Sequence, residues 1–262
     1  MVPLETALAK DRFMALKVII LGALSAVGEA TARLYAAQGA ALVLAGRHAG
    51  RLLAVAADLK VRGAAQVEIA EMDLAKAGGA AIEAALDGWR EALGGIDHVV
   101  LAYGVLGDQS ALERDLDASG DLIDINFRSA ALWCLAVAAR LEGQKSGSLV
   151  VLGSVAGDRG RQSNHIYGAS KAGLALLVQG LAHRLAASGA RAVIVKPGFI
   201  DSPMTAHLPK GGPLWSSPVQ IAAVVRAAAD KGGPVVYAPG YWRMILLVIR
   251  LVPSFIFHKT RL

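Results

Sequence analysis

The sequence predicts a three-layer α/β fold in which a seven-stranded parallel sheet carries helices on both faces. Two observations support this prediction. Short apolar runs alternate along the chain with longer segments in which apolar residues recur at helical spacing. The short runs are apolar almost throughout, as in strands that are buried on both faces. Regular alternation of such strands with helices is typical of a parallel sheet.

The seven expected strands are Lys17–Leu21, Ala41–Ala45, Gln66–Ala70, His98–Ala102, Ser148–Leu152, Ala192–Val195 and Pro234–Tyr237. Helical periodicity fills the intervals between them, as in Glu29–Gln38 and Leu52–Arg62. No internal repeat or low-complexity linker interrupts the pattern, so residues 1–262 are expected to form a single domain. Ligands of such sheets bind beyond the carboxyl ends of the strands.

The composition excludes several classes of function. A single cysteine, Cys134, rules out a disulfide framework and fits a reducing compartment such as the cytoplasm. The six histidines show no pair at ligand spacing, so no metal site is expected. The net charge of +6 is not gathered in a long basic run, which argues against nucleic acid. The segment from Met1 to Lys17 lacks the apolar stretch of a signal peptide, so secretion is not expected.

A glycine-rich turn follows the first strand and leads straight into a helix. Glycines let the backbone turn sharply and approach a pyrophosphate, while the amino end of the helix offers unpaired N–H groups and positive potential. This position predicts a dinucleotide site, and an ordinary tight turn is the alternative. The candidate contacts are Gly22, Leu24, Ser25, Ala26, Val27 and Gly28.

The end of the second strand indicates which dinucleotide is preferred. Folds that bind NAD place an acidic side chain near this point, for the ribose 2′-hydroxyl. Gly46 offers no carboxylate here, and Arg47 can bind a 2′-phosphate through charge-assisted hydrogen bonds. NADP(H) is therefore the predicted cofactor, unless Arg47 is only a solvated loop charge. Asp73, followed by Leu74, either accepts a hydrogen bond from adenine or caps the next helix.

Tyr167 and Lys171 lie four residues apart in a helical pattern from about Asn164 to Ala187, so both face one side of the helix. Ser154 follows the strand Ser148–Leu152, where a loop at the carboxyl end begins. A ketone that receives a hydride becomes an alkoxide and needs a proton, which a phenol can supply. An ammonium about 4 Å away would lower the phenol pKa by roughly two to three units. Ser154 would orient the substrate oxygen.

Asn126 lies in a helical segment before the strand that leads to Ser154. An asparagine inside a helix is mildly unfavourable, which indicates a local kink with a bound water. A hydrogen bond within the core is the alternative interpretation.

Taken together, these residues resemble the short-chain dehydrogenase/reductase family over about Lys17 to Tyr237. The resemblance implies a Rossmann fold and usually a homodimer or homotetramer built on long helices. It implies a catalytic tetrad of Asn126, Ser154, Tyr167 and Lys171. It also implies nicotinamide contacts in a proline-glycine loop, made by Pro197, Gly198, Ile200 and Ser202.

Two stretches depart from the family pattern. Ala26 stands where the middle glycine of the turn is usual. The stretch after the fourth strand, which lines the cofactor in the family as Asn-Asn-Ala-Gly, reads Leu101, Ala102, Tyr103 and Gly104 here. The loss of those asparagines removes one support of the central sheet and leaves Tyr103 unexplained.

The segment from Ala102 to Gln109 resembles a subgroup of reductases that act on a polyprenyl-phosphoryl 2-keto-pentose. The expected function is therefore NADPH-dependent reduction of a ketone to a secondary alcohol, on a lipid-linked keto-sugar. Reduction of 3-oxoacyl, steroid-like or other small apolar carbonyls is the alternative. An alternative of another class is a non-catalytic regulator or scaffold that binds NADP.

The carboxyl-terminal segment, residues 241–262, is apolar and basic. Twelve helical residues from Tyr241 to Val252 span about 18 Å, too short for a bilayer core of about 30 Å. With its arginines and lysine, the segment either lies in the interface on the inner face of a membrane, or packs into a dimer interface or over the substrate cleft. The loop from Ser202 to Pro218 is either a substrate lid or a variable surface loop.

Overall fold

Seven strands form one parallel sheet in the computed structural model, which describes residues 15–260. They are β1 (Lys17–Leu21), β2 (Ala41–Gly46), β3 (Gln66–Glu71), β4 (His98–Leu101), β5 (Ser148–Leu152), β6 (Arg191–Pro197) and β9 (Val235–Ala238). Their order is β3-β2-β1-β4-β5-β6-β9, and every neighbouring pair is parallel. The order reverses between β1 and β4, which is where open α/β sheets bind ligands. The expectation that the segment from Met1 to Lys17 is not a signal peptide concerns residues that lie almost wholly outside the described range.

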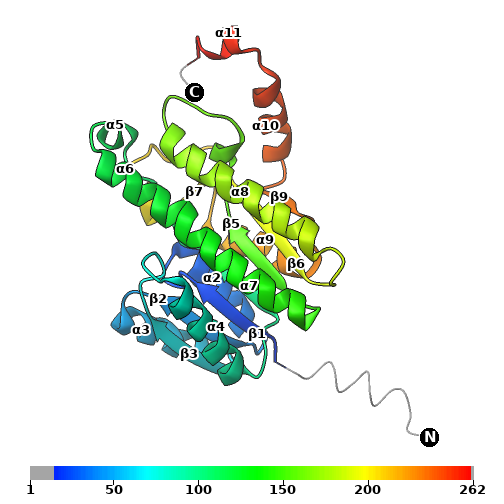
Figure 1. Cartoon of the computed structure of the whole chain (residues 1–262). Helices are drawn as coiled ribbons and strands as arrows, with labels where there is room; N and C mark the ends of the chain where they lie inside the picture. The colour runs from blue at the N-terminus through cyan, green and yellow to red at the C-terminus, as the bar shows by residue number, and fades with distance from the viewer. Residues whose placement is uncertain (1–14, 261–262) are drawn as a thin grey trace, which may run out of the picture.

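Helices cover both faces of the sheet (Figure 1). One layer consists of α2 (Ala26–Ala36), α3 (Ala49–Val61) and α9 (Pro218–Lys231); the other consists of α4 (Gly79–Leu93), α7 (Ala130–Gln144) and α8 (His165–Leu185). Successive strand residues point to opposite faces, so β1 sends Val18 and Ile20 into the first layer and Ile19 and Leu21 into the second. The predicted three-layer fold with a seven-stranded sheet is confirmed.

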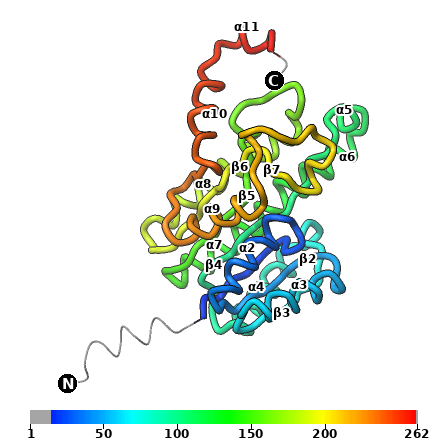
Figure 2. The backbone as a smooth tube through the Cα atoms, turned by 180° about the vertical axis from the view of Figure 1, so that it is seen from behind, coloured from blue at the N-terminus to red at the C-terminus, as the bar shows by residue number. Residues whose placement is uncertain are grey.

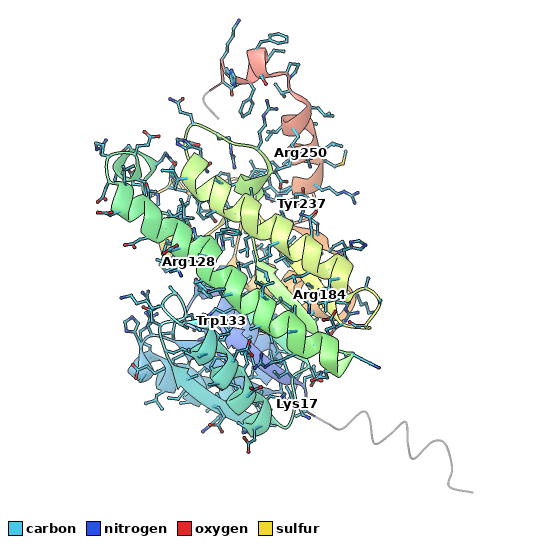
Figure 3. The ribbon with its side chains drawn as sticks, in the orientation of Figure 1. Lys17, Arg128, Trp133, Arg184, Tyr237 and Arg250 are labelled. Carbon is cyan, nitrogen blue, oxygen red and sulfur yellow. The ribbon has the colours of Figure 1, made fainter. Side chains whose placement is uncertain are left out.

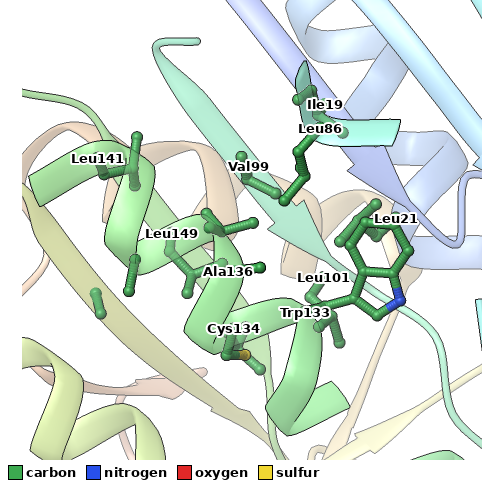
Figure 4. Close-up of a cluster of buried hydrophobic side chains, with 14 of the residues drawn as sticks. Ile19, Leu21, Leu86, Val99, Leu101, Trp133, Cys134, Ala136, Leu141 and Leu149 are labelled. Carbon is green, nitrogen blue, oxygen red and sulfur yellow. The ribbon is translucent and has the colours of Figure 1, made fainter. Parts of the chain in front are cut away.

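The core on the α4–α7–α8 side is drawn in Figure 4. Trp133 of α7 is fully buried there and stacks on Trp89 of α4, with the ring centres 5.7 Å apart. Its indole Nε1 donates a hydrogen bond to the Leu74 carbonyl at 3.0 Å. The buried indole therefore both fills the layer and holds the loop that follows β3.

Short elements lie in the loops that follow the strands. They are α5 (Gln109–Leu112), α6 (Leu116–Ile123), the π-helical turn η1 (Asp124–Ser129), η2 (Val155–Asp158), β7 (Phe199–Ile200), η3 (Pro203–Thr205) and β8 (Trp215–Ser216). β7 and β8 pair with each other outside the main sheet. These elements surround the edge of the sheet to which the sequence assigned the site.

One continuous helical stretch, Leu116–Gln144, joins α6, η1 and α7. Within the described residues, it is the one helix long and apolar enough to cross a membrane: it has 29 residues, and an 18-residue window within it has a mean hydropathy of 1.4. It packs against α8 and α4 as a layer of the fold. The apolar composition is therefore explained by the core that the helix forms.

The chain ends in α10 (Trp242–Leu251) and α11 (Ser254–Phe257), separated by Pro253. Both stand away from the layered body in the two opposite views of Figures 1 and 2. The expected helix over Tyr241–Val252 is present, one residue shorter at each end.

Candidate active site

The turn between β1 and α2 depends on its two glycines. Gly22 has a φ of 87° and donates its N–H to the Ala45 carbonyl at 3.0 Å. A Cβ on Gly28 would lie 2.5 Å from the Gly22 carbonyl oxygen, so the turn closes only if position 28 lacks a side chain. Ser25 caps α2 by accepting the Gly28 N–H at 3.1 Å. The first N–H groups of α2, which begins at Ala26, face the edge of the sheet without helical partners, as an anion requires.

The end of β2 lies beside this turn. A Cβ on Gly46 would lie 3.7 Å from Leu24 Cγ, and Arg47 follows with an exposed side chain. The predicted contacts for the adenosine end of a dinucleotide therefore come together.

Asp73 caps a short turn and not the helix that follows, so the alternative of a helix cap is wrong and the adenine contact stays a prediction. Its Oδ1 accepts the Ala75 N–H at 3.0 Å, in the turn after β3. The cap does not belong to α4, which starts only at Gly79 after Gly78. Leu74 is buried beside it.

Tyr103 has a structural explanation that the sequence did not reveal. Its phenol forms a hydrogen bond of 3.0 Å with Ser129 Oγ, at the end of η1. A Cβ on Gly22 would lie 2.7 Å from Tyr103 Cβ, so the residue also packs directly on the glycine turn. Burial raises the pKa of this phenol above its ordinary value. Tyr103 thus links the glycine turn to η1, within the stretch that departs from the family pattern.

Asn126 lies in the widened turn η1, so the expected local irregularity of the helix is present. Its Nδ2 donates to the Val105 carbonyl and its Oδ1 accepts the Val105 N–H, both at 2.8 Å. The amide therefore holds the loop after β4, as in the alternative of a core hydrogen bond.

Ser154, Tyr167 and Lys171 meet at the end of β5. Ser154 has an extended backbone, and its Oγ accepts the Ala156 N–H at 3.1 Å. Lys171 Nζ donates to the Leu152 carbonyl at 3.1 Å and lies 5.9 Å from the centre of the Tyr167 ring. The buried ammonium thus sits between the last residue of β5 and the phenol of the same helix.

Asn126 approaches the same point from the neighbouring loop. A Cβ on Gly104 would lie 2.9 Å from Asn126 Oδ1 and 3.3 Å from Lys171 Nζ. The four side chains predicted to act together, from η1, the β5 loop and α8, are therefore gathered at one edge of the sheet.

The predicted lowering of the Tyr167 pKa is wrong for this conformation. Burial raises the pKa of the Tyr167 phenol, and the Ser154 side chain opposes this by hydrogen bonding. The ammonium of Lys171 is directed to the Leu152 carbonyl rather than to the phenol. Burial also lowers the pKa of Lys171 itself to about 8, so its charge is not permanent. Desolvation outweighs the attraction that the sequence prediction assumed.

The family model of the short chain dehydrogenases matches residues 16–212. The chain is a short-chain dehydrogenase/reductase. An uncharacterised oxidoreductase of Mycobacterium tuberculosis is 37% identical over 247 residues, covering 92% of this chain and 96% of that protein. An uncharacterised oxidoreductase encoded in the mprA 5′ region of Streptomyces coelicolor is also 37% identical, over 244 residues, covering 92% and 94%.

Solved structures agree with this membership. A short chain dehydrogenase/reductase family protein superimposes with a TM-score of 0.74 at 26% identity, covering 87% of this chain and 97% of its own. A short-chain type dehydrogenase/reductase from Mycobacterium marinum superimposes with a TM-score of 0.77 at 24% identity, covering 89% and 98%, and shows the shared fold. The predictions of an oxidoreductase acting on CH–OH or C=O groups, and of a nicotinamide cofactor, are confirmed.

Sequence reasoning missed a buried charged cluster that supports the catalytic edge of this short-chain dehydrogenase/reductase. Asp158 ends η2, four residues after Ser154; its Oδ1 lies 2.5 Å from Lys196 Nζ, and its Oδ2 accepts the Tyr237 hydroxyl at 2.6 Å. The ion pair is buried, with side chains only 2% and 9% exposed. It ties the Ser154 loop to the ends of β6 and β9. The one signal in the sequence was a lysine inside an apolar strand.

The proline-glycine loop has a second unforeseen support. A Cβ on Gly198 would overlap the Trp242 ring, so α10 lies directly against the loop predicted to hold the nicotinamide. Phe199 continues the contact by stacking on Trp215 at 5.3 Å between ring centres. Pro197 ends β6, whereas Ser202 caps η3.

A cavity of about 660 Å³ opens beside Gly104. The loop after β4 forms one wall, from Gly104 to Asp108, and Met204 and His207 form the other. These last two residues belong to the loop from Ser202 to Pro218, which therefore borders the space available to a substrate.

Proposed function

We propose that the enzyme reduces a ketone to a secondary alcohol with NADPH, and that Tyr167 is its proton donor. The observation that carries this proposal is the convergence of Ser154, Tyr167 and Lys171 at the end of β5, beside an open cavity. Burying the Lys171 ammonium costs free energy, and buried titratable groups of this kind are concentrated at functional sites.

The glycine turn fits a dinucleotide. A side chain at Gly28 would close the turn against Gly22, and the amino end of α2 faces the same edge. A reduced nicotinamide dinucleotide, when bound, supplies the hydride that the ketone carbon receives. The further contacts we assign to it follow the carboxyl ends of β1, β3, β4 and β6: Leu24, Ser25, Ala26, Val27, Asp73, Leu74, Ala102, Tyr103, Gly104, Pro197, Gly198, Ile200 and Ser202.

Each of the four side chains has a separate role in the transfer of the proton. Ser154 donates a hydrogen bond to the ketone oxygen and fixes its position. Tyr167 transfers its phenolic proton to that oxygen as negative charge develops there. Lys171 is mainly protonated at neutral pH because its pKa is about 8, and its charge stabilises the phenolate that remains. Asn126 holds the adjoining loop by its two bonds to Val105.

Replacing Tyr167 by phenylalanine tests the mechanism. Removal of the proton donor should lower kcat by about 10²- to 10⁴-fold, with NADPH consumption as the readout. Tyr35→Phe is the matched control, because the buried Tyr35 hydroxyl has no hydrogen-bond partner within the described residues. Full turnover by the Tyr167→Phe variant would reject the proposed chemistry.

The preference for NADPH rests on Arg47. It follows β2 directly, beside the glycine turn, and no carboxylate stands at Gly46. Arg47→Ala should raise the KM for NADPH at least tenfold while changing the KM for NADH little, because only NADPH carries the 2′-phosphate. Lys60→Ala, which removes an exposed cation farther along α3, serves as the control. Equal effects on both cofactors would contradict the assignment.

We propose a lipid-linked keto-sugar as the substrate. The cavity joins apolar residues, Val105, Leu106 and Met204, to polar ones, Asp108 and His207, which suits a polar sugar with an apolar attachment. The test compares a polyprenyl-phosphate ketosugar with soluble ketones. Turnover of only 3-oxoacyl or steroid-like ketones would favour the alternative substrate class, for which the apolar wall alone suffices.

We further infer a cytoplasmic homodimer or homotetramer. Large apolar side chains are exposed on the long helices: Leu116 and Ile123 of α6, Leu135 of α7 and Leu176 of α8. A dimer or tetramer built on these helices would cover them. Sedimentation velocity should show a species of at least two subunits.

A further inference from the structure

Helix α10 has two apolar faces, and only one of them packs against the rest of the fold. The inner face of α10 buries Trp242 and Leu246 against Val155. The outer face exposes Met244, Leu247, Val248 and Leu251, with between 48% and 72% of each residue open to solvent. These four positions follow the spacing of a single helical stripe. Phe255 and Ile256 of α11 are also exposed, and we call these six residues together the outer stripe.

The outer stripe lies in a basic stretch of the sequence. From Lys231 to Leu262 the sequence holds five lysines and arginines and no aspartate or glutamate. The whole chain has 27 basic and 21 acidic residues, so this segment contributes +5 of the net +6. Arg243 and Arg250 lie seven residues apart, on one flank of α10, and Figure 3 shows Arg250 on that helix. An apolar stripe flanked by cations is complementary to an anionic lipid surface.

Although α10 and α11 stand away from the layered body, side-chain contacts join them to it. Arg159, which directly follows Asp158, donates from Nη1 to the Val252 carbonyl at 2.7 Å and to the Ile249 carbonyl. The same guanidinium lies 3.8 Å from the centre of the Phe257 ring. α10 and α11 are therefore fastened to the loop of Ser154, and α10 also rests on Gly198. A stripe fixed in this way is presented outward as one surface.

We infer that the outer stripe docks the enzyme on the surface of an anionic phospholipid bilayer. The ten residues of α10 span about 15 Å, half of a bilayer core, so the helix lies in the interface and does not cross. A second copy of the chain fits less well, because two such segments would bring like charges together without an acidic residue between them. This inference goes beyond the proposed reaction and does not depend on it.

Flotation of the full-length protein with vesicles tests the docking. Wild type should bind vesicles that contain phosphatidylglycerol and bind those of pure phosphatidylcholine at least tenfold less. The Leu247→Glu/Val248→Glu variant should lose binding to the anionic vesicles at least tenfold. Leu53→Glu/Val61→Glu is the matched control, since both residues are exposed apolar positions on α3. Absence of wild-type binding to anionic vesicles at low salt, or an equal loss in both variants, overturns the proposal.

The charges are tested separately. Arg243→Glu/Arg250→Glu should weaken binding to anionic vesicles by tenfold or more, since each basic residue near such a surface contributes several-fold. Lys60→Glu/Arg90→Glu makes the same charge change on exposed positions of α3 and α4 and should weaken binding much less. Sedimentation velocity tests whether a second copy of the chain covers the outer stripe instead. That alternative is supported if wild type does not bind vesicles and forms an oligomer that dissociates in the Leu247→Glu/Val248→Glu variant.

Discussion

The two loops that meet the active-site edge are built in different ways. The turn between β1 and α2 is shaped by backbone hydrogen bonds and by the lack of side chains at Gly22 and Gly28. The loop after β5 is held by charged side chains from distant strands, through the buried cluster of Asp158, Lys196 and Tyr237. The first closes by steric fit between Gly22 and Gly28 and is joined to Ala45 by a backbone hydrogen bond. The second depends on side-chain partners 38 and 79 residues away.

This difference predicts how each loop fails. A loop that is shaped by steric fit tolerates changes of charge and pH but does not tolerate an added side-chain volume. A loop held by a buried ion pair fails when one partner is removed, because the other charge is left desolvated. The following changes test the comparison, from the largest expected effect to the smallest.

Asp158→Ala should lower the free energy of unfolding by about 3–5 kcal/mol, because it leaves the Lys196 ammonium buried without a partner. Chemical denaturation measures the loss. Glu142→Ala removes one side of an exposed pair with Arg184 and should cost about 1 kcal/mol or less. The Asp158→Leu/Lys196→Met variant should recover part of the loss, since no unpaired charge remains. Equal costs for Asp158→Ala and Glu142→Ala would show that the buried cluster has no special role.

Gly28→Ala should lower stability by about 1–3 kcal/mol, because the new Cβ meets Gly22 O at 2.5 Å and Ser25 Oγ at 2.8 Å. The affinity for the dinucleotide, followed by fluorescence titration, should fall at least tenfold as the turn opens. Gly180→Ala is the control: position 180 lies within α8 with nothing within 4 Å, so alanine there should stabilise by about 0.5–1 kcal/mol. A Gly28→Ala variant that binds as tightly as wild type would contradict the steric account.

The same contrast explains how much could be read from the sequence. The glycine turn and the Tyr167–Lys171 spacing are local patterns, so their positions were predicted correctly. The seven strands were placed to within about two residues, although β6 extends to Pro197 because its carboxyl end pairs with β9. Long-range contacts left no local pattern: the bond of Tyr103 to Ser129 and the packing of Trp242 on Gly198 join residues brought together only by folding.

The predicted direction of the Tyr167 pKa shift was wrong for a related reason. Sequence spacing showed that an ammonium lies one helical turn from the phenol, but not that both groups are buried. Burial disfavours the charged form of each group, and the Lys171 ammonium is directed to the Leu152 carbonyl rather than to the phenol.

That burial makes Lys171 the source of two opposite pH effects. The pKa of Lys171 in the folded protein is about 8, below its ordinary value. Between pH 8 and the ordinary lysine pKa, this lysine is therefore protonated in the unfolded state and neutral in the folded state. Its contribution to the free energy of unfolding should rise with pH across that window. Activity should fall over the same range, because the neutral amine no longer stabilises the phenolate. We expect kcat/KM for NADPH, which reports the free enzyme, to fall by up to tenfold per pH unit above about 8. Lys171→Met should remove the rise in stability seen by chemical denaturation. Buried Cys134 has a raised pKa and opposes this rise at higher pH, so the comparison is made between wild type and variant. If Lys171→Met showed the same change in stability above pH 8 as wild type, Lys171 would not be the group that titrates.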